Sequence, residues 1–215
     1  LKGIAPELSI FQYADKPIDA IIATGSDNTN RYFRSKYGDL PAIFRGSRAS
    51  VAILTGSESK DQLAGLAGDI FTYSGLGCRN VSRLFVPRGY DMTTLLPVLN
   101  SFDRVNPKYI NNFRQRRAVL TMQKDQFIEG SFYLLHESDP FPSAISEVTY
   151  SRYDNITEIT GWLQENDVRI QCVVSSEAVA RLISHPRSTG FGCSQMPGLT
   201  DYPDAVDVMA FLSVI

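Results

Sequence analysis

Short apolar runs that alternate with helix-like segments constrain this 215-residue chain more than any other feature. Ala49–Leu54 and Ile170–Val174 are almost wholly apolar, which is typical of strands that are buried on both faces. After the first of these runs, apolar residues recur at helical spacing up to Ile70. Because parallel strands are joined by helical crossovers, this order predicts an α/β fold, a three-layer sandwich with a mostly parallel sheet.

The same hydrophobic patterns predict the other strands and helices. The other expected strands are Ile18–Thr24, Val81–Val86, Ser131–Leu135 and Val148–Tyr153. The other expected helices are Asn30–Tyr37, Met92–Val105, Tyr109–Gln123, Ile156–Gln164 and Ala178–Ile183. The apolar tail Val206–Leu212 is expected to be a strand that can pair with a partner sheet, so we expect a homo-oligomer.

Composition excludes several classes of protein. The formal net charge is −2, whereas proteins that bind duplex nucleic acid normally carry a basic excess, so we expect no nucleic-acid partner. Apolar runs fall far short of the ~20 residues that cross a bilayer, and we expect neither a membrane span nor a signal peptide. The three cysteines are far apart and lack CxxC spacing, so we expect no disulfide framework, no metal site and a cytoplasmic location.

Cys78 is the leading candidate for chemistry. It follows Gly75-Leu76-Gly77, a turn that can bring backbone N–H groups close to a ligand. Positive neighbours such as Arg79, or free N–H dipoles, can lower a thiol pKa from ~8.5 into the range in which the thiolate attacks a carbonyl. Asn80 could donate a hydrogen bond to a developing oxyanion. The alternative is that Cys78 is a small buried apolar residue, the usual fate of a single cysteine.

Other candidate motifs are weaker. His136 and His185 show no motif that links them to a nucleophile, and we interpret both as structural or surface residues. The segment Thr24-Gly25-Ser26 ends a strand and runs into a helix, which is a good position for a phosphate; an ordinary capped turn is the alternative.

Taken together, these segments resemble the aldehyde dehydrogenase superfamily, and within it the LuxC-like acyl-CoA reductases. The resemblance lies in Ile21–Ser26 with Asn28 and Thr29, in Arg45–Leu54, Asp69–Phe71 and Gly75–Pro87, and in Gln195–Tyr202 with Asp204, Asp207 and Phe211-Leu212. It runs from about residue 18 to the end of the chain, and the order and spacing of the motifs carry it.

The resemblance implies a role for several residues. Cys78 would be the nucleophile, and Thr24, Gly25 and Ser26 would contact a nicotinamide cofactor, NADPH or NADH. Asp139 and Phe141 match the family segment whose acid holds the nicotinamide ribose, although the acid here is one methylene shorter and Glu137 competes for the position.

Phe44 stands where hydrolytic members of the family carry a general-base glutamate, and a phenylalanine cannot activate water. The resemblance therefore implies an acyl-CoA or acyl-thioester substrate that is reduced to an aldehyde. Residues 1–45 would close a nucleotide-binding domain, the rest of which is expected upstream, and residues 46–215 would form the catalytic domain. Two alternatives remain open: a CoA-acylating aldehyde dehydrogenase for short acyl chains, and a noncatalytic scaffold of the same fold.

Overall fold

The computed structural model describes residues 18–215, which form two compact units. One unit contains the chain up to Ser47 together with Asp207–Ile215, and the other comprises Arg48–Val206. The division falls after Ser47, close to the boundary expected after residue 45, but the last nine residues group with the first unit and not with the second. Residues 1–17 of the expected first domain lie outside the described part of the chain.

In the described part of the first unit, residues 18–47 and 207–215, the chain forms two strands and two α-helices. Strands β1 (Ile21–Thr24) and β2 (Ala42–Arg45) pair in parallel, and α1 (Asp27–Tyr37) connects them. β2 was not predicted. The tail is helix α7 (Val208–Leu212) and not the expected strand, because the Asp207 carboxylate accepts a hydrogen bond from the Ala210 N–H and so caps a helical turn.

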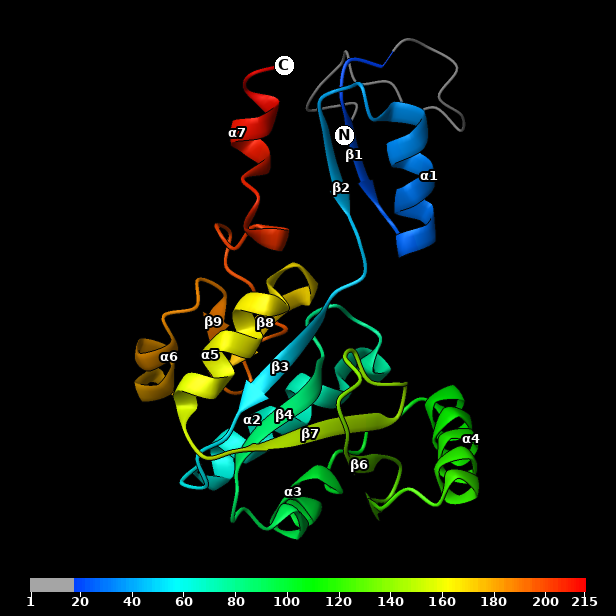
Figure 1. Cartoon of the computed structure of the whole chain (residues 1–215), viewed down its shortest axis with the longest axis vertical. Helices are drawn as coiled ribbons and strands as arrows, with labels where there is room; N and C mark the ends of the chain where they lie inside the picture. The colour runs from blue at the N-terminus through cyan, green and yellow to red at the C-terminus, as the bar shows by residue number, and fades with distance from the viewer. Residues whose placement is uncertain (1–17) are drawn as a thin grey trace. The chain divides into compact units, whose positions relative to one another are not determined.

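The second unit is built on a seven-stranded sheet (Figure 1). Its strand order is β5-β6-β7-β4-β3-β8-β9, and every pair is parallel except β5–β6. The strands are β3 (Ala49–Ile53), β4 (Val81–Pro87), β5 (Phe127–Glu129), β6 (Leu134–Glu137), β7 (Glu147–Tyr153), β8 (Ile170–Val174) and β9 (Ser188–Thr189). The predicted α/β class with a mostly parallel sheet is confirmed.

Five α-helices belong to this unit: α2 (Lys60–Phe71), α3 (Leu96–Leu99), α4 (Pro107–Gln123), α5 (Ile156–Glu165) and α6 (Glu177–Ile183). The helix predicted over Met92–Val105 is wrong as a single element. A 3₁₀ turn, Met92–Leu95, precedes the single helical turn α3, and Pro97 stands in the first turn of α3. Because proline has no N–H to donate, the chain cannot continue one helix through this point.

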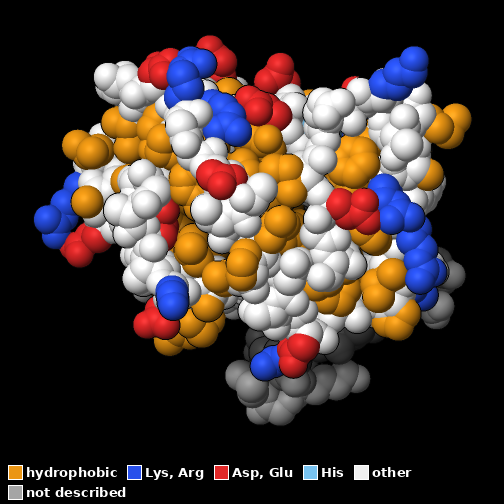
Figure 2. All heavy atoms as spheres, turned by 90° about the horizontal axis from the view of Figure 1, so that it is seen from below, with side chains coloured by type: hydrophobic (Ala, Val, Ile, Leu, Met, Phe, Trp, Pro, Cys, Tyr) orange, Lys and Arg blue, Asp and Glu red, His pale blue; other side chains and the backbone are white. Residues whose placement is uncertain are grey.

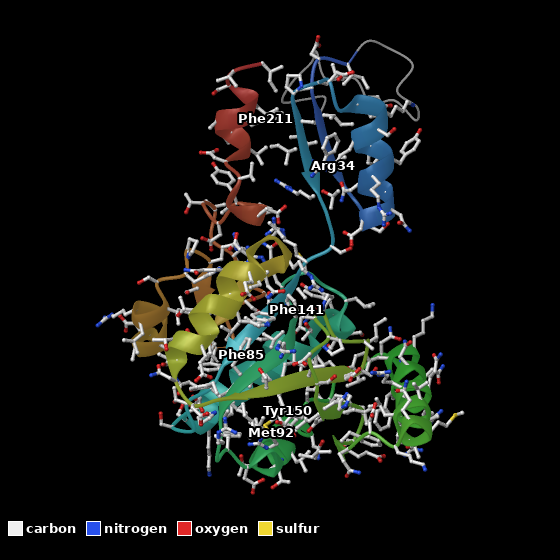
Figure 3. The ribbon with its side chains drawn as sticks, in the orientation of Figure 1. Arg34, Phe85, Met92, Phe141, Tyr150 and Phe211 are labelled. Carbon is white, nitrogen blue, oxygen red and sulfur yellow. The ribbon has the colours of Figure 1, made fainter. Side chains whose placement is uncertain are left out.

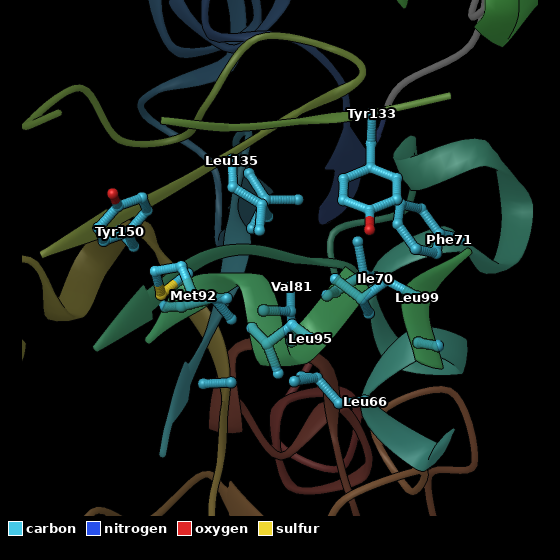
Figure 4. Close-up of a cluster of buried hydrophobic side chains, with 14 of the residues drawn as sticks. Leu66, Ile70, Phe71, Val81, Met92, Leu95, Leu99, Tyr133, Leu135 and Tyr150 are labelled. Carbon is cyan, nitrogen blue, oxygen red and sulfur yellow. The ribbon is translucent and has the colours of Figure 1, made fainter. Parts of the chain in front are cut away.

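Two separate apolar clusters lie on the two faces of the sheet. α2 and α3 cover one face with a cluster that includes Leu66, Phe71 and Leu95 (Figure 4). α5 and α6 cover the other, where Phe85 and Phe141 are buried (Figure 3). Helices on both faces complete the predicted three-layer sandwich.

The surface mixes side-chain types. On the face shown in Figure 2, acidic and basic side chains are interspersed among apolar ones. No helix within residues 18–215 combines the length and the apolar character needed to cross a membrane.

Two helical glycines form a matched test of packing between α2 and the segment around Phe191. A Cβ on Gly65 would lie 2.8 Å from the Gly192 nitrogen, whereas one on Gly161 would meet nothing within 4 Å. We expect Gly161→Ala to stabilise the fold by about 0.5–1 kcal/mol, since alanine is the better helix former. Gly65→Ala is expected to destabilise it by about 1–3 kcal/mol, because backbone must move. Urea unfolding followed by circular dichroism measures both, and equal effects would contradict this packing.

Candidate active site

The loop that carries Cys78 begins with an unusual turn at the end of α2. A 3₁₀ turn, Thr72–Gly75, follows the helix, and three successive residues have left-handed backbone: Tyr73 (φ 56°), Ser74 (φ 58°) and Gly75 (φ 64°). This conformation costs about 1–2 kcal/mol for a residue other than glycine. The turn redirects the chain toward β4 and leaves the Tyr73 ring exposed.

Cys78 has an exposed thiol on this loop. Its carbonyl oxygen accepts a hydrogen bond from the Ser50 hydroxyl at 3.1 Å, and that hydroxyl accepts from the Cys172 N–H at 3.0 Å. Its own N–H donates to no acceptor within residues 18–215. The alternative of a buried apolar cysteine is therefore wrong: the residue presents a thiol to solvent and an N–H without an acceptor.

Asn80 does not have the role that the sequence predicts. Its side-chain NH₂ lies within hydrogen-bonding distance of the carbonyl oxygens of Asp69, Ile70 and Thr72, at 3.0, 3.0 and 2.8 Å, and its Oδ1 accepts from the Gly77 N–H at 2.9 Å. Because both amide hydrogens are occupied, none is left for an oxyanion. Asn80 is a positioning residue that joins the end of α2 to the Cys78 loop.

Asp69 is a second positioning residue, and sequence reasoning assigned it no role. Its buried carboxylate accepts hydrogen bonds from the Gly192 N–H, the Ser194 N–H and the Ser194 hydroxyl, at 2.7, 3.0 and 2.7 Å. Burial raises the pKa of Asp69, and these hydrogen bonds oppose the rise. One feature of the sequence indicates this role: Asp69 lies on the apolar face of a helix, between Leu66 and Ile70, and a buried acid is almost always hydrogen-bonded.

Arg79 connects the loop to β8 and the C-terminal segment. Its guanidinium donates to the Cys172 sulfur and to the Ser194 carbonyl oxygen, both at 3.3 Å. Burial raises the pKa of Cys172, so its thiol is protonated at neutral pH. The Arg79 guanidinium therefore contacts Cys172. The sequence-based interpretation of Arg79 as a positive neighbour of Cys78 did not include this contact.

Residues of this loop line two cavities. One of about 190 Å³ is lined by Gly77 and Asn80 and by residues 142–148. The other, of about 250 Å³, is lined by Arg79, Cys172 and Cys193. All three cysteines of the chain thus lie on or beside the Cys78 loop.

The predicted cofactor segment has one accessible acid and one buried ring. Asp139 has a fully exposed side chain, and Arg83 holds its loop by donating to the carbonyl oxygens of Ser138 and Asp139 at 2.9 and 3.0 Å. Phe141 is 5 % exposed and packs edge-on against Trp162 at 5.2 Å between ring centroids. A ring packed into the core has no free face for a nicotinamide, so the predicted contact by Phe141 is wrong.

Thr24, Gly25 and Ser26 belong to the first unit, which is described by itself. The Ser26 hydroxyl caps α1 by accepting from the Thr29 N–H at 3.3 Å. A Cβ on Gly25 would lie 2.7 Å from the Thr29 side chain, so only glycine fits there. The turn leaves the carboxyl ends of two parallel strands side by side beneath a helix N-terminus, as a nucleotide phosphate requires.

Both histidines already have carboxylate partners. His136 is buried and its Nδ1 lies 2.6 Å from a Glu147 oxygen, which Arg116 also contacts. The Nε2 of His185 lies 3.2 Å from Asp167, and burial lowers the pKa of this histidine. In the part of the chain that the structure describes, no three His, Cys, Asp or Glu side chains gather to hold a metal.

Comparisons with known proteins identify the fold. No family model matches the sequence, and no curated protein matches it. Solved aldehyde dehydrogenases match the structure. KauB from Pseudomonas aeruginosa matches with a TM-score of 0.62 and 12 % sequence identity, over 90 % of this chain and 50 % of KauB. An NAD-dependent aldehyde dehydrogenase from Sinorhizobium meliloti matches with a TM-score of 0.64 and 12 % identity, over 89 % of this chain and 47 % of that enzyme. An indole-3-acetaldehyde dehydrogenase from P. syringae, in complex with NAD⁺ and IAA, matches at 0.62 with 12 % identity over 84 % and 45 %.

The chain therefore has an aldehyde dehydrogenase fold, as the sequence predicted, and spans about half the length of these structures. At this level of identity the likeness establishes the fold alone. The LuxC-like resemblance stays a prediction.

The contacts of Asn80 generate the first prediction for this site. Asn80→Ala leaves three carbonyl groups and the Gly77 N–H without these partners, and we expect a loss of about 2–3 kcal/mol of unfolding free energy. Asn112→Ala is the matched control, since its amide bonds one carbonyl oxygen on the surface of α4 and its loss should change stability by less than about 0.5 kcal/mol. Similar losses in urea unfolding would contradict the assignment.

The raised pKa of Asp69 leads to a second prediction for this site, on how stability depends on pH. A carboxyl group with a higher pKa in the folded than in the unfolded state binds protons more tightly when folded, so its contribution to stability falls as pH rises above the unfolded pKa near ~4. Asp69→Asn has no such titration. We expect the unfolding free energy of the wild type, relative to Asp69→Asn, to decrease as pH rises from about 3.5. An increase over that window would show that hydrogen bonding outweighs burial.

Proposed function

We propose that this chain is the catalytic part of an NAD(P)-dependent oxidoreductase that reduces an acyl-CoA to an aldehyde through a thioester on Cys78. The observation that carries the proposal is Cys78 itself, an exposed thiol whose own N–H has no acceptor among residues 18–215. The aldehyde dehydrogenase fold supports it, and the P. syringae neighbour is a complex with NAD⁺.

In this mechanism the Cys78 thiolate attacks the carbonyl carbon of the acyl thioester. A carbon–sulfur bond forms to Cys78, and the bond from that carbon to the CoA sulfur breaks, so CoA leaves as a thiolate. The free N–H of Cys78 donates to the oxygen on which negative charge develops. Asn80 and Asp69 keep that N–H in place without touching the substrate.

Each unit, taken by itself, offers groups that suit one part of a nicotinamide cofactor. Thr24, Gly25 and Ser26 would hold its phosphates, because the Gly25 turn has no room for a Cβ and places the N-terminus of α1 at the strand ends. Asp139, exposed and fixed through its backbone by Arg83, would hold the ribose. When bound, the reduced cofactor would supply a hydride to the acyl carbon, and the carbon–sulfur bond to Cys78 would break to release the aldehyde and the Cys78 thiolate.

We infer from Phe44 that water does not hydrolyse the acyl group: in the resemblance, this residue of β2 replaces a general-base glutamate, and the Arg34 guanidinium lies 5.1 Å from its ring centre. An aromatic ring accepts no proton from water, so the resemblance implies that the acyl group would persist until it is reduced or returned to a thiol, in either direction of the reaction. The CoA-acylating aldehyde dehydrogenase remains the second candidate, since it uses the same steps in reverse.

Acylation tests the proposal without any cofactor. We expect the chain to release one equivalent of CoA from an acyl-CoA and to gain the mass of one acyl group on Cys78, found by peptide mass spectrometry. Cys78→Ala should abolish both signals. Cys193→Ser, which changes the other exposed thiol, is the matched control and should retain them. Acylation of Cys193 instead, or no CoA release by the folded wild type, would contradict the proposed function and favour the alternative hypothesis of a noncatalytic scaffold.

A further inference from the structure

The cavity of about 250 Å³ beside the Cys78 loop is lined by polar side chains with unused hydrogen-bonding capacity, and one of their atoms, the Arg187 Nε, is fully buried. Gln171 lines it, is 3 % exposed, and makes no side-chain hydrogen bond within residues 18–215. The Arg187 Nε also lacks a partner there. Buried polar groups are almost always hydrogen-bonded, and leaving one unpaired costs about 1–3 kcal/mol. A polar ligand in the cavity would satisfy them.

The charged side chains on the cavity wall indicate the sign of the ligand's charge. Arg79 is half-buried on the cavity wall and contacts a thiol and a carbonyl oxygen, but among the described residues it forms no ion pair with a carboxylate. The Cys172 thiol is protonated and does not neutralise it, because burial raises its pKa. A guanidinium facing a small cavity without a counter-ion favours an anion.

The other charged groups limit the anion to a single charge. Arg187, on the same wall, is already paired with Asp167. Asp201 also lines the cavity; its carboxylate is exposed and accepts from the Gly198 N–H at 2.9 Å. Asp69, which bonds Ser194 beside Arg79, adds a second carboxylate near the cavity. With one guanidinium that has no carboxylate partner and this negative charge nearby, a singly charged planar group is favoured over a phosphate dianion. A carboxylate also matches the paired N–H donors of Arg79 and the amide of Gln171.

We propose that this cavity binds a carboxylate group, and that the substrate acylating Cys78 carries it at the far end of its acyl chain. Arg79 follows Cys78 directly in the sequence, and Cys172 on the cavity wall shares the Ser50 hydroxyl with the Cys78 carbonyl, so the cavity adjoins the loop. The second part of the proposal rests on the proposed function, whereas the affinity of the cavity for a carboxylate does not.

Cys193 is a built-in reporter of occupancy, because it is exposed and lines this cavity, whereas Cys78 does not line it. We expect succinate to slow alkylation of Cys193 by iodoacetamide, by about fivefold at about four times its Kd. Peptide mass spectrometry gives the rate at each cysteine. Sodium chloride at the same ionic strength, and inorganic phosphate, are the comparison salts. Equal protection by chloride, or protection by phosphate but not by succinate, would overturn the carboxylate site.

Two variants test the residues. Arg79→Gln should abolish protection by succinate, and Arg114→Gln, at an exposed position on α4, should leave it unchanged. Gln171→Glu keeps Arg79 but supplies a carboxylate from the chain itself, so it should also abolish protection and provides a second test if Arg79→Gln fails to fold. Protection retained in a folded variant of either kind would overturn the site.

The substrate class is tested with two thioesters of equal chain length, succinyl-CoA and butyryl-CoA. We expect faster acylation of Cys78 by succinyl-CoA, and loss of this preference in Gln171→Glu. Equal rates alongside protected Cys193 would overturn the assignment of the carboxylate to the substrate. If neither thioester acylates Cys78 but succinate still protects Cys193, the proposed function fails and the carboxylate site stands.

Discussion

Asp69 carries a carboxylate into a part of the protein that water does not reach, and three donors from segment 192–194 surround it. Burial alone makes this placement unfavourable, which is why the pKa of the group is raised. The hydrogen bonds offset that cost, and they hold the C-terminal segment against α2. The Ser194 carbonyl oxygen then accepts from Arg79, so the same contact fixes the residue that follows Cys78.

The left-handed turn at Tyr73–Gly75 is held by hydrogen bonds from the Cys78 loop. Left-handed backbone at Tyr73 and Ser74 costs free energy, and a free peptide would not adopt it. Asn80 compensates by bonding carbonyl groups at the end of α2 together with the Gly77 N–H. With Asn80 committed to these groups, the Cys78 N–H is left without an acceptor among residues 18–215, and the thiol faces outward.

Sequence reasoning succeeded where one short-range pattern decides the structure. Ile170–Val174 is a strand with the predicted bounds because every residue in it is buried, and Cys78 was selected because the glycine turn is local. It failed where the deciding partner is distant or not apolar. The amide of Asn80 is used by α2, and Phe141 is covered by Trp162, neither of which can be read from adjacent residues. The tail 206–212 was misread because its apolar content fits a strand as well as a helix, and a single cap at Asp207 decides between them.

Residues of the Cys78 loop line two cavities of different chemistry, and Cys78 itself lines neither of them. On one side, the cavity of about 190 Å³ is lined by the segment that follows Asp139, the acid proposed to hold a ribose. On the other, the cavity of about 250 Å³ contains the unneutralised Arg79 and the unpaired Gln171. In the proposed reaction at Cys78, the cofactor and the acyl group would have to approach from different directions, since the hydride and the Cys78 sulfur both bond to one carbon. Neighbouring residues of one short loop provide this: Gly77 and Asn80 line the first cavity, and Arg79 lines the second.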